Sequence, residues 1–273
     1  MSGSTAPRLS VTMITRNSAS KAPGLFARVL ESVAWADEII IVDAASGDAT
    51  PSIAAQYTDK VFIHPWPGSF RLQRERALSY ATCEWVLWID DDEIVPAALA
   101  EAIRAALRRP AANAFWLGGV HYFLGRPLQH CGWARNLRIW RRGVGGFRPE
   151  DVHESYVVAG AHDELQPSLV HHSTPGLRGR LEKQIFIAET LAARFPGPAA
   201  WSGGEVWRRM IKPSLGNFYQ VYWRVRGYRD GIAGLIWAVT WALEPFYAAA
   251  FQWAHAQAEQ ESRSPTPGNP NET

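Results

Sequence analysis

The chain has few of the features that would mark it as secreted, repetitive or nucleic-acid binding. Its 273 residues include only two cysteines, Cys83 and Cys131, whose separation fits no metal-binding spacing, so we expect a reducing compartment. The first ten residues contain no long apolar run, from which we expect no signal peptide. There is no internal repeat. The formal net charge of +2 gives no electrostatic reason to expect a nucleic-acid partner.

Lysine is also scarce, since only four of the 28 basic side chains are lysines. Arginine forks suit phosphate recognition, although a GC-rich genome produces the same bias. Tryptophan is abundant, with 13 in the chain. Several of them lie between Trp201 and Trp253, which favours a sugar-binding or membrane-interface surface there.

The first hundred residues alternate between apolar, β-branched runs and helical patterns. We predict strands at Leu9–Thr15, Glu38–Val42, Lys60–His64 and Trp85–Ile89, and helices at Gly24–Val33, from Thr50 onward, at Arg71–Ala81 and at Pro96–Leu107. Thr50 is expected as the N-cap of its helix, with Pro51 at the first helical position. Strands separated by helices of this length indicate a parallel sheet with right-handed crossovers.

After Pro110 the pattern changes to that of a mixed sheet followed by helices. We expect strands at Ala114–Tyr122, Leu137–Trp140, Ser155–Val158 and Leu169–His172, and a helix at Leu177–Phe195. The fold class is therefore α/β, with a mixed sheet and helices on both faces.

The C-terminal part is aromatic, basic and then strongly apolar. The segment from Ile232 to Ala256 is interrupted by Glu244-Pro245. It suits two interfacial helices, a hairpin or one kinked span that associates with a membrane; the alternative is a core helix of a soluble domain.

Four consecutive acidic residues, Asp90-Asp91-Asp92-Glu93, follow the strand at Trp85–Ile89. Open α/β sheets bind ligands at the carboxyl ends of their strands. Carboxylates this close repel one another unless a cation lies between them. The block therefore predicts a divalent metal that holds a phosphorylated substrate. The alternative is a solvated acidic turn that caps the next helix.

Other polar groups end or precede predicted strands. Asp43 ends the second strand, and a carboxylate there can accept hydrogen bonds from a base or a ribose. Arg74 and Arg76 could reach a diphosphate, and Arg138 lies on a strand that presents guanidinium groups. The segment Glu150–Glu154 places three carboxylates around His153, which suits a general base beside a metal ligand. His171 and His172 end another apolar run, where the alternative is a structural histidine.

The order of these motifs resembles the inverting family-2 glycosyltransferases of GT-A fold. Within that family the chain is most similar to the bacterial lipopolysaccharide-core enzymes that add β-glucose to heptose. The resemblance covers roughly residues 9 to 235. It is carried by the segments Ser10–Asn17, Ala36–Asp43, Trp66-Pro67-Gly68, Gln73–Leu78, Asp90–Glu93, Leu137–Arg142 and Val152–Glu154.

The resemblance implies a role for each matched position. Thr15 and Asp43 would hold the nucleotide base, Asp90 would lie near the ribose, and Asp92 would bind Mg²⁺ or Mn²⁺. His153 is also assigned to the metal, and Asp151 or Glu154 would be the catalytic base. The full set expected to contact the nucleotide sugar is Thr15, Asn17, Asp43, Asp48, Arg74, Arg76, Asp90 and Arg138.

This resemblance also implies the domain organisation and the partners. We expect an N-terminal tail at 1–8, a nucleotide-sugar-binding half at 9–110, an acceptor half at 111–200, a helical region at 201–257 and a disordered tail at 258–273. The expected donor is a nucleotide-diphosphate sugar such as a UDP-sugar. The expected acceptor is a glycolipid or lipopolysaccharide core, met at the cytoplasmic face of the bacterial inner membrane. The alternatives are an inactive nucleotide-sugar-binding protein and an aspartate-dependent phosphotransferase.

Overall fold

The computed structural model describes residues 7–108, 112–148, 156–172, 176–194, 197 and 201–263. It divides into two compact units, Met1–Pro175 and Gly176–Thr273. The helix predicted at Leu177–Phe195 falls in the second unit, and not with the rest of the 111–200 segment.

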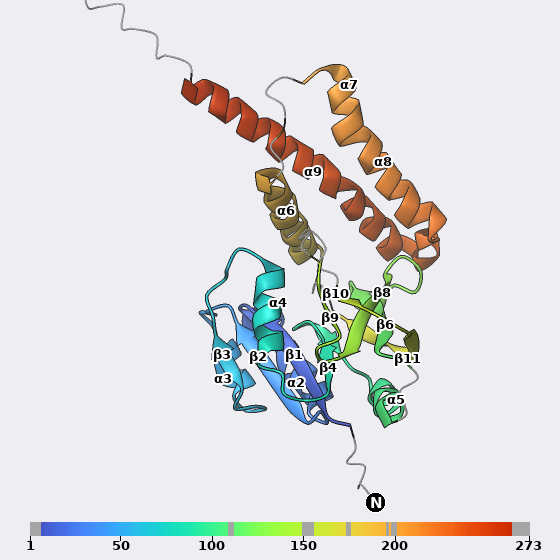
Figure 1. The fold of residues 1–273 in the computed structure, drawn as a ribbon. Coiled ribbons are helices and arrows are strands. Elements are labelled where there is room, and N and C mark those ends of the chain that lie inside the picture. Colours follow the sequence, from blue (N-terminus) through green and yellow to red (C-terminus); the bar gives the residue numbers. More distant parts are fainter. Residues whose placement is uncertain are drawn as a thin grey trace, which may run out of the picture. The chain divides into compact units, whose positions relative to one another are not determined.

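The first unit is built on one mixed sheet (Figure 1). Its first four strands are parallel and lie in the order β3-β2-β1-β4. They are β1 Leu9–Thr15, β2 Glu38–Asp43, β3 Val61–Ile63 and β4 Trp85–Trp88. Because all four point the same way, the residues that follow β1, β2 and β4 meet at one edge of the sheet.

The sheet continues through strands of mixed direction. The strand β8 is antiparallel to both β4 and β6, and β11 is parallel to β6 and antiparallel to β5. The bounds are β5 Glu93–Ile94, β6 Ala114–Phe123, β8 Trp133–Arg141 and β11 His162–His171; the short β7 Arg126–Pro127 pairs with β6, and β9 Gly145–Phe147 pairs with β10 Tyr156–Val158. The sheet thereby brings the acidic block, which runs into β5, next to the end of β11.

Helices cover both faces of this sheet, as predicted. Neighbouring side chains of a strand point to opposite faces, so Ile39 and Ile41 lie in one apolar core and Ile40 in the other. The first core packs against α2, α3 and α5, and the second packs against α4 (Figure 1). The helices are α1 Ser18–Lys21, α2 Leu25–Val33, α3 Thr50–Ala54, α4 Phe70–Ser79 and α5 Ala97–Arg108.

Several predicted boundaries were wrong. Ala49, and not Thr50, is the N-cap of α3; Asp48 Oδ1 accepts the Thr50 backbone N–H at 3.0 Å, so the carboxylate supplies the cap. The strands β8 and β11 begin well before the predicted 137 and 169, because both extend along the backbone of β6. The strand at 156–158 pairs with β9 outside the main sheet.

The second unit is helical. Its helix α6 (Leu177–Arg194) packs on the long helix α9 (Gly231–Arg263). The segment between them forms one run of helix with π-helical turns, followed by a short 3₁₀ turn: α7 Gly203–Val206, η1 Trp207–Ile211, α8 Lys212–Phe218, η2 Tyr219–Arg224 and η3 Gly227–Asp230. Of the alternatives for 232–256, the structure has one continuous helix with Pro245 inside it. The tail predicted from 258 was wrong in its first residues, since α9 continues to Arg263.

A buried carboxylate, Glu38 at the start of β2, links the parallel strands. It accepts hydrogen bonds from Ser10 on β1, from Lys60, and from the backbone and side chain of Thr82, both at 2.9 Å. Burial acts to raise its pKa, but these hydrogen bonds outweigh burial and lower the pKa to about 2. Since the folded pKa is depressed, the stabilisation is complete above the unfolded value of about 4.5 and is lost as the pH falls toward 2.

We therefore expect acid to destabilise the first unit through Glu38. A shift of this size corresponds to about 3 kcal/mol. Urea unfolding measured between pH 7 and pH 2.5 should show a smaller loss of unfolding free energy for Glu38→Gln than for the native chain. Equal pH slopes for the two chains would contradict the role given to Glu38.

Candidate active site

The acidic block forms a tight turn that is held from both sides. The Ile89 backbone N–H donates to the Thr12 carbonyl at 3.3 Å, and the His172 N–H donates to the Asp92 carbonyl at 2.8 Å. Within the turn, the Asp90 N–H donates to Glu93 Oε2 at 2.9 Å. Backbone hydrogen bonds to β1 and to the residue after β11 therefore fix the turn that carries these carboxylates.

Asp90 and Glu93 point to the same arginine. Arg138 Nη2 lies 2.6 Å from Glu93 Oε1 and 3.4 Å from Asp90 Oδ2, and Arg74 Nη2 lies 2.9 Å from Asp90 Oδ1. Burial acts to raise the pKa of Asp90, but the two guanidiniums outweigh it and hold that pKa well below its usual range. Burial dominates at Glu93 and raises its pKa. Both carboxylates thus already have cationic partners within the protein.

A β-bulge places Arg138 in this cluster. On β8, Ile139 pairs with Phe115 and Leu137 pairs with Trp116, so Arg138 is the extra residue between them. A bulge of this kind re-aims a side chain, and here the guanidinium is almost wholly buried.

Asp91 and Asp92 diverge from that pair. Asp91 bonds Ser18 and lies 3.2 Å from Lys21 Nζ, while Asp92 Oδ1 lies 3.1 Å from His171 Nε2. Burial raises the pKa of Asp91, and the charge of Asp92 beside it adds to the rise. Sequence reasoning did not identify Ser18 or Lys21 as partners. The sequence predicts His171 at the end of a strand, but its contact with Asp92 arises from the pairing of β5 with β11.

The ends of β1 and β2 form a second polar group at the same edge. Asp43 is fully buried, and it accepts hydrogen bonds from Thr15 Oγ1 at 2.8 Å and from the Ser46 backbone N–H at 2.7 Å. Asn17, with a left-handed φ of 52°, bonds Ser46 Oγ through its backbone and accepts the Gly47 N–H. These bonds shape the loop that follows β2.

Asp48 links this loop to the starts of α1 and α3. It accepts the Ser20 N–H at 2.8 Å and bonds both the backbone and the hydroxyl of Thr50. Burial acts to raise its pKa, but the hydrogen bonds outweigh it and lower the pKa to about 2. In the described residues Asp43 and Asp48 therefore anchor the loop with their own carboxylates.

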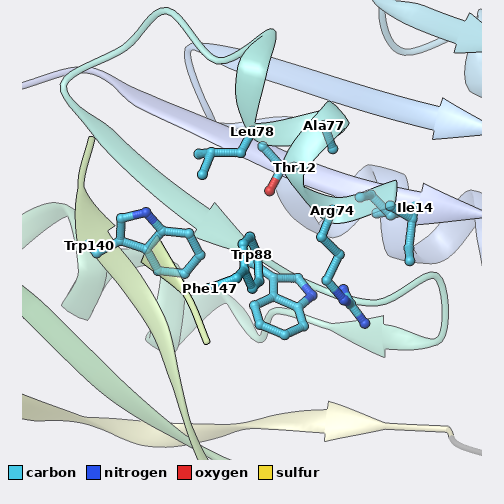
Figure 2. Close-up of a pocket in the computed structure, with 9 residues that line it drawn as sticks. Thr12, Ile14, Arg74, Ala77, Leu78, Trp88, Trp140 and Phe147 are labelled. Atoms are coloured by element: carbon cyan, nitrogen blue, oxygen red, sulfur yellow. The ribbon is translucent and has the colours of Figure 1, made fainter. Parts of the chain in front are cut away.

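Trp88 supports the arginines beside the acidic block. The Arg74 guanidinium lies 3.8 Å from the centre of the Trp88 ring and that of Arg138 lies 4.9 Å from it. Figure 2 shows Trp88 with Trp140 and Phe147 around a small hollow near Arg74. Its volume of about 10 Å³ holds about one water molecule. The hollow is therefore a small gap in the packing between the strands and α4 and is too small for a ligand. Arg76, also predicted for the diphosphate, donates instead to Pro65 O and to Gln73 Oε1, and so its described bonds do not involve the acidic block.

A larger cavity lies against the acidic block on β6, β8 and β11. Its volume is about 220 Å³. This is smaller than the sites of drug-sized ligands and suits a single ring. Carboxylate, guanidinium, amide and imidazole groups share its wall with apolar side chains: Asp90, Glu93, Leu117, Gly119, His121, Ala134, Asn136, Arg138, Leu169 and His171. Such a mixture of donors and acceptors suits the hydroxyl groups of a sugar.

The predicted metal site is only partly within the described residues. Asp151, His153 and Glu154 lie outside them. Among the residues that the structure describes, no three His, Cys, Asp or Glu side chains form a group that could hold a metal ion. Mg²⁺ is usually bound by one or two carboxylates together with substrate phosphates, and the carboxylate of Asp92, a fifth exposed, suits that role.

Comparisons with known proteins show which family this chain resembles. The pattern that defines "Glycosyl transferase family 2" matches residues 10–154, more than half of the chain. The lipopolysaccharide core biosynthesis glycosyltransferase LpsC of Rhizobium meliloti is 27% identical over 234 residues, which cover 82% of this chain and 85% of LpsC. An uncharacterized glycosyltransferase of Rickettsia felis is 39% identical over 87 residues, 32% of this chain and 29% of its own length.

Among solved structures, the 1–349 segment of TarS from S. aureus in complex with UDP has a TM-score of 0.44 at 16% identity, covering 94% of this chain and 92% of that one. The predicted GT-A class agrees with the mixed sheet, its helices on both faces and the family match. The matched residues include the acidic block, Asp43 and Arg138. This chain therefore belongs to glycosyltransferase family 2 and is a glycosyltransferase.

Proposed function

We propose that the enzyme moves a neutral hexose, glucose in our prediction, from a nucleotide-diphosphate sugar to a cell-envelope acceptor such as lipopolysaccharide core. The likeness to LpsC over most of both chains supports the acceptor class. The observation that carries the rest is the cavity of about 220 Å³ beside the acidic block. Two carboxylates and one guanidinium in its wall disfavour an anionic sugar, because a further negative charge would be repelled.

The donor would lie across the strand ends. Thr15, Asn17, Asp43 and Asp48 shape the loop that we assign to the nucleotide. Arg74, Arg76 and Arg138 supply positive charge for the diphosphate, although Arg74 and Arg138 must share it with Asp90. Asp92 and His153 would hold Mg²⁺ or Mn²⁺, which when bound would supply positive charge to the leaving diphosphate.

Transfer with inversion needs a base on the face of the sugar opposite the leaving diphosphate. We assign this role to Asp151 or Glu154. This carboxylate takes the proton of the acceptor hydroxyl as the hydroxyl oxygen forms a bond to C1 of the sugar. The bond from C1 to the diphosphate breaks on the opposite face. A base is needed because an unassisted hydroxyl is a weak nucleophile.

Substitution of the two candidate bases should separate binding from chemistry. We expect Asp151→Asn or Glu154→Gln to abolish transfer while leaving donor binding within a few-fold of the native value, because neither change alters the residues assigned to the nucleotide. Calorimetric titration with the donor and single-turnover transfer measure the two properties. Normal transfer by both variants would place the base elsewhere.

The alternatives considered for the sequence are less well supported. A phosphotransferase would need Asp90 as its nucleophile, but both of its carboxylate oxygens lie against guanidiniums. Family membership also favours an enzyme over an inactive binding protein. We place the reaction at the cytoplasmic face of the bacterial inner membrane, where a glycolipid acceptor would be available.

The proposed reaction can be tested with a panel of UDP-, GDP- and dTDP-sugars, with Mg²⁺ or Mn²⁺ and a lipopolysaccharide-core acceptor. We expect metal-dependent release of nucleoside diphosphate, fastest with an uncharged UDP-hexose. A preference for a UDP-uronic acid would contradict the assignment of the cavity to a neutral sugar. Turnover that a chelator leaves unchanged would contradict the proposed metal requirement.

A further inference from the structure

The long helix α9 leaves a stripe of apolar side chains uncovered. Ile232, Val239, Phe246 and Trp253 are spaced by seven residues and so lie on one face of the helix. Their exposed fractions run from 36% to 77%. Leu235 lies on the same side and is 39% exposed. A continuous stripe of this length is uncommon on a surface that stays in water.

The other face of α9 packs on α6 through polar contacts. Arg180 is 5% exposed, lies 3.8 Å from the centre of the Trp237 ring and donates from Nε to Thr240 Oγ1 at 3.2 Å. One turn further along, Gln184 donates to Glu244 Oε2 at 3.2 Å. These contacts fall in the middle of the apolar part of α9.

Those contacts disfavour a transmembrane orientation. Within the described residues, Gly227–Ser262 is the one stretch of helix long and apolar enough to cross a membrane, and only 33% of its most apolar window is buried. If α9 crossed a bilayer, Arg180 and Glu244 would enter the hydrocarbon with it. The charged residues of α6 would follow, at a high cost: Arg178, Arg180, Glu182, Lys183, Glu189 and Arg194.

The neighbouring helical run carries aromatic and basic side chains toward solvent. Leu215, Tyr219 and Trp223 are spaced by four residues and are 55% to 62% exposed. This run lies alongside α9 (Figure 1). Residues 201–230 hold six basic side chains and two acidic ones: Arg208, Arg209, Lys212, Arg224, Arg226 and Arg229, against Glu205 and Asp230. Exposed aromatic rings next to arginines suit the interface of an anionic bilayer.

We propose that the unit Gly176–Thr273 lies flat on an anionic lipid bilayer and does not cross it. The apolar stripe of α9 and the rings of Tyr219 and Trp223 enter the boundary between headgroups and acyl chains. The basic residues meet the phosphates, and α6 stays on the aqueous side of α9. This orientation goes beyond the peripheral localisation proposed above, and it is independent of the donor and acceptor.

Labelling of single cysteines distinguishes lying from crossing. The full chain carries Cys131→Ser, since Cys83 is buried, together with either Ser202→Cys, just before α7, or Ser262→Cys, near the end of α9. Each protein is bound to sealed vesicles of phosphatidylglycerol and phosphatidylethanolamine and treated with a membrane-impermeant maleimide. We expect both positions to react to the same extent with and without detergent. Protection of either position that detergent removes would show a crossing helix and overturn the proposal.

Vesicle flotation tests the lipid partner itself. We expect binding to phosphatidylglycerol vesicles and little binding to pure phosphatidylcholine, and about ten-fold weaker binding for Tyr219→Ser/Trp223→Ser. Ile232→Ser repeats the test at a second site, and far-UV circular dichroism checks folding. Phe186→Ser on α6 removes a ring that is 48% exposed but lies outside the stripe, and this variant should float like the native chain. Unchanged flotation of Tyr219→Ser/Trp223→Ser and of Ile232→Ser, or a change only in their oligomeric state, would overturn the proposal.

Discussion

Asp92→Ala is expected to abolish sugar transfer and to leave the fold intact. Asp92 Oδ1 lies 3.1 Å from His171 Nε2, and the turn is held by a backbone hydrogen bond to the Asp92 carbonyl, which the substitution keeps. Loss of the carboxylate would remove the metal and with it the stabilisation of the leaving diphosphate. We expect kcat to fall on the order of 1,000-fold. Steady-state release of nucleoside diphosphate measures the loss.

The neighbouring aspartate provides a matched control. Asp91 bonds Ser18 and Lys21 on the other side of the turn, so Asp91→Asn should keep kcat within a few-fold. Circular dichroism and urea unfolding would check that both variants fold. An active Asp92→Ala, or equal losses in the two variants, would remove the metal assignment from Asp92.

Arg138→Met is expected to give the largest loss of stability. Arg138 is 6% exposed and neutralises Glu93, which is 2% exposed. The variant would leave the buried Glu93 carboxylate without its guanidinium, and the imidazole of His171, whose Nδ1 lies 3.8 Å from Glu93 Oε1, is a more distant partner. Removing one partner of a buried ion pair costs about 3–5 kcal/mol. Urea unfolding at pH 7 measures the change in the free energy of unfolding.

Two further variants isolate the cause of that loss. Arg138→Met combined with Glu93→Gln removes both charges and should be more stable than Arg138→Met alone. Arg141→Met, on the same strand, removes an ion pair with Glu84 whose side chains are 38% and 49% exposed, and it should cost about 1 kcal/mol or less. If Arg141→Met cost as much as Arg138→Met, burial of the pair would not explain the effect.

The parallel half of the sheet was predictable because its signals are local. Buried strands such as Glu38–Asp43 are continuous apolar runs, and helices of about ten residues separate them, so each element can be read from its own segment. The acidic block could be placed at a strand end for the same reason. The strands β8 and β11 were less predictable, because Arg135, Asn136 and other polar residues interrupt the apolar pattern and long-range backbone pairing holds the strand.

The same distinction holds for the candidate site. The chain order of acidic and basic motifs was enough to indicate the family, the fold class and the place of Asp90–Glu93 at a strand end. The chain order could not indicate which basic side chain pairs with which carboxylate. Lys21 reaches the block from α1, which follows β1, the strand paired with β4. Arg138 and His171 reach it from distant segments, through the pairing of β8 with β4, the bulge at Arg138 and the pairing of β11 with β5. These partners depend on sheet register, and register is set by packing across the whole sheet, so no single segment of the chain encodes it.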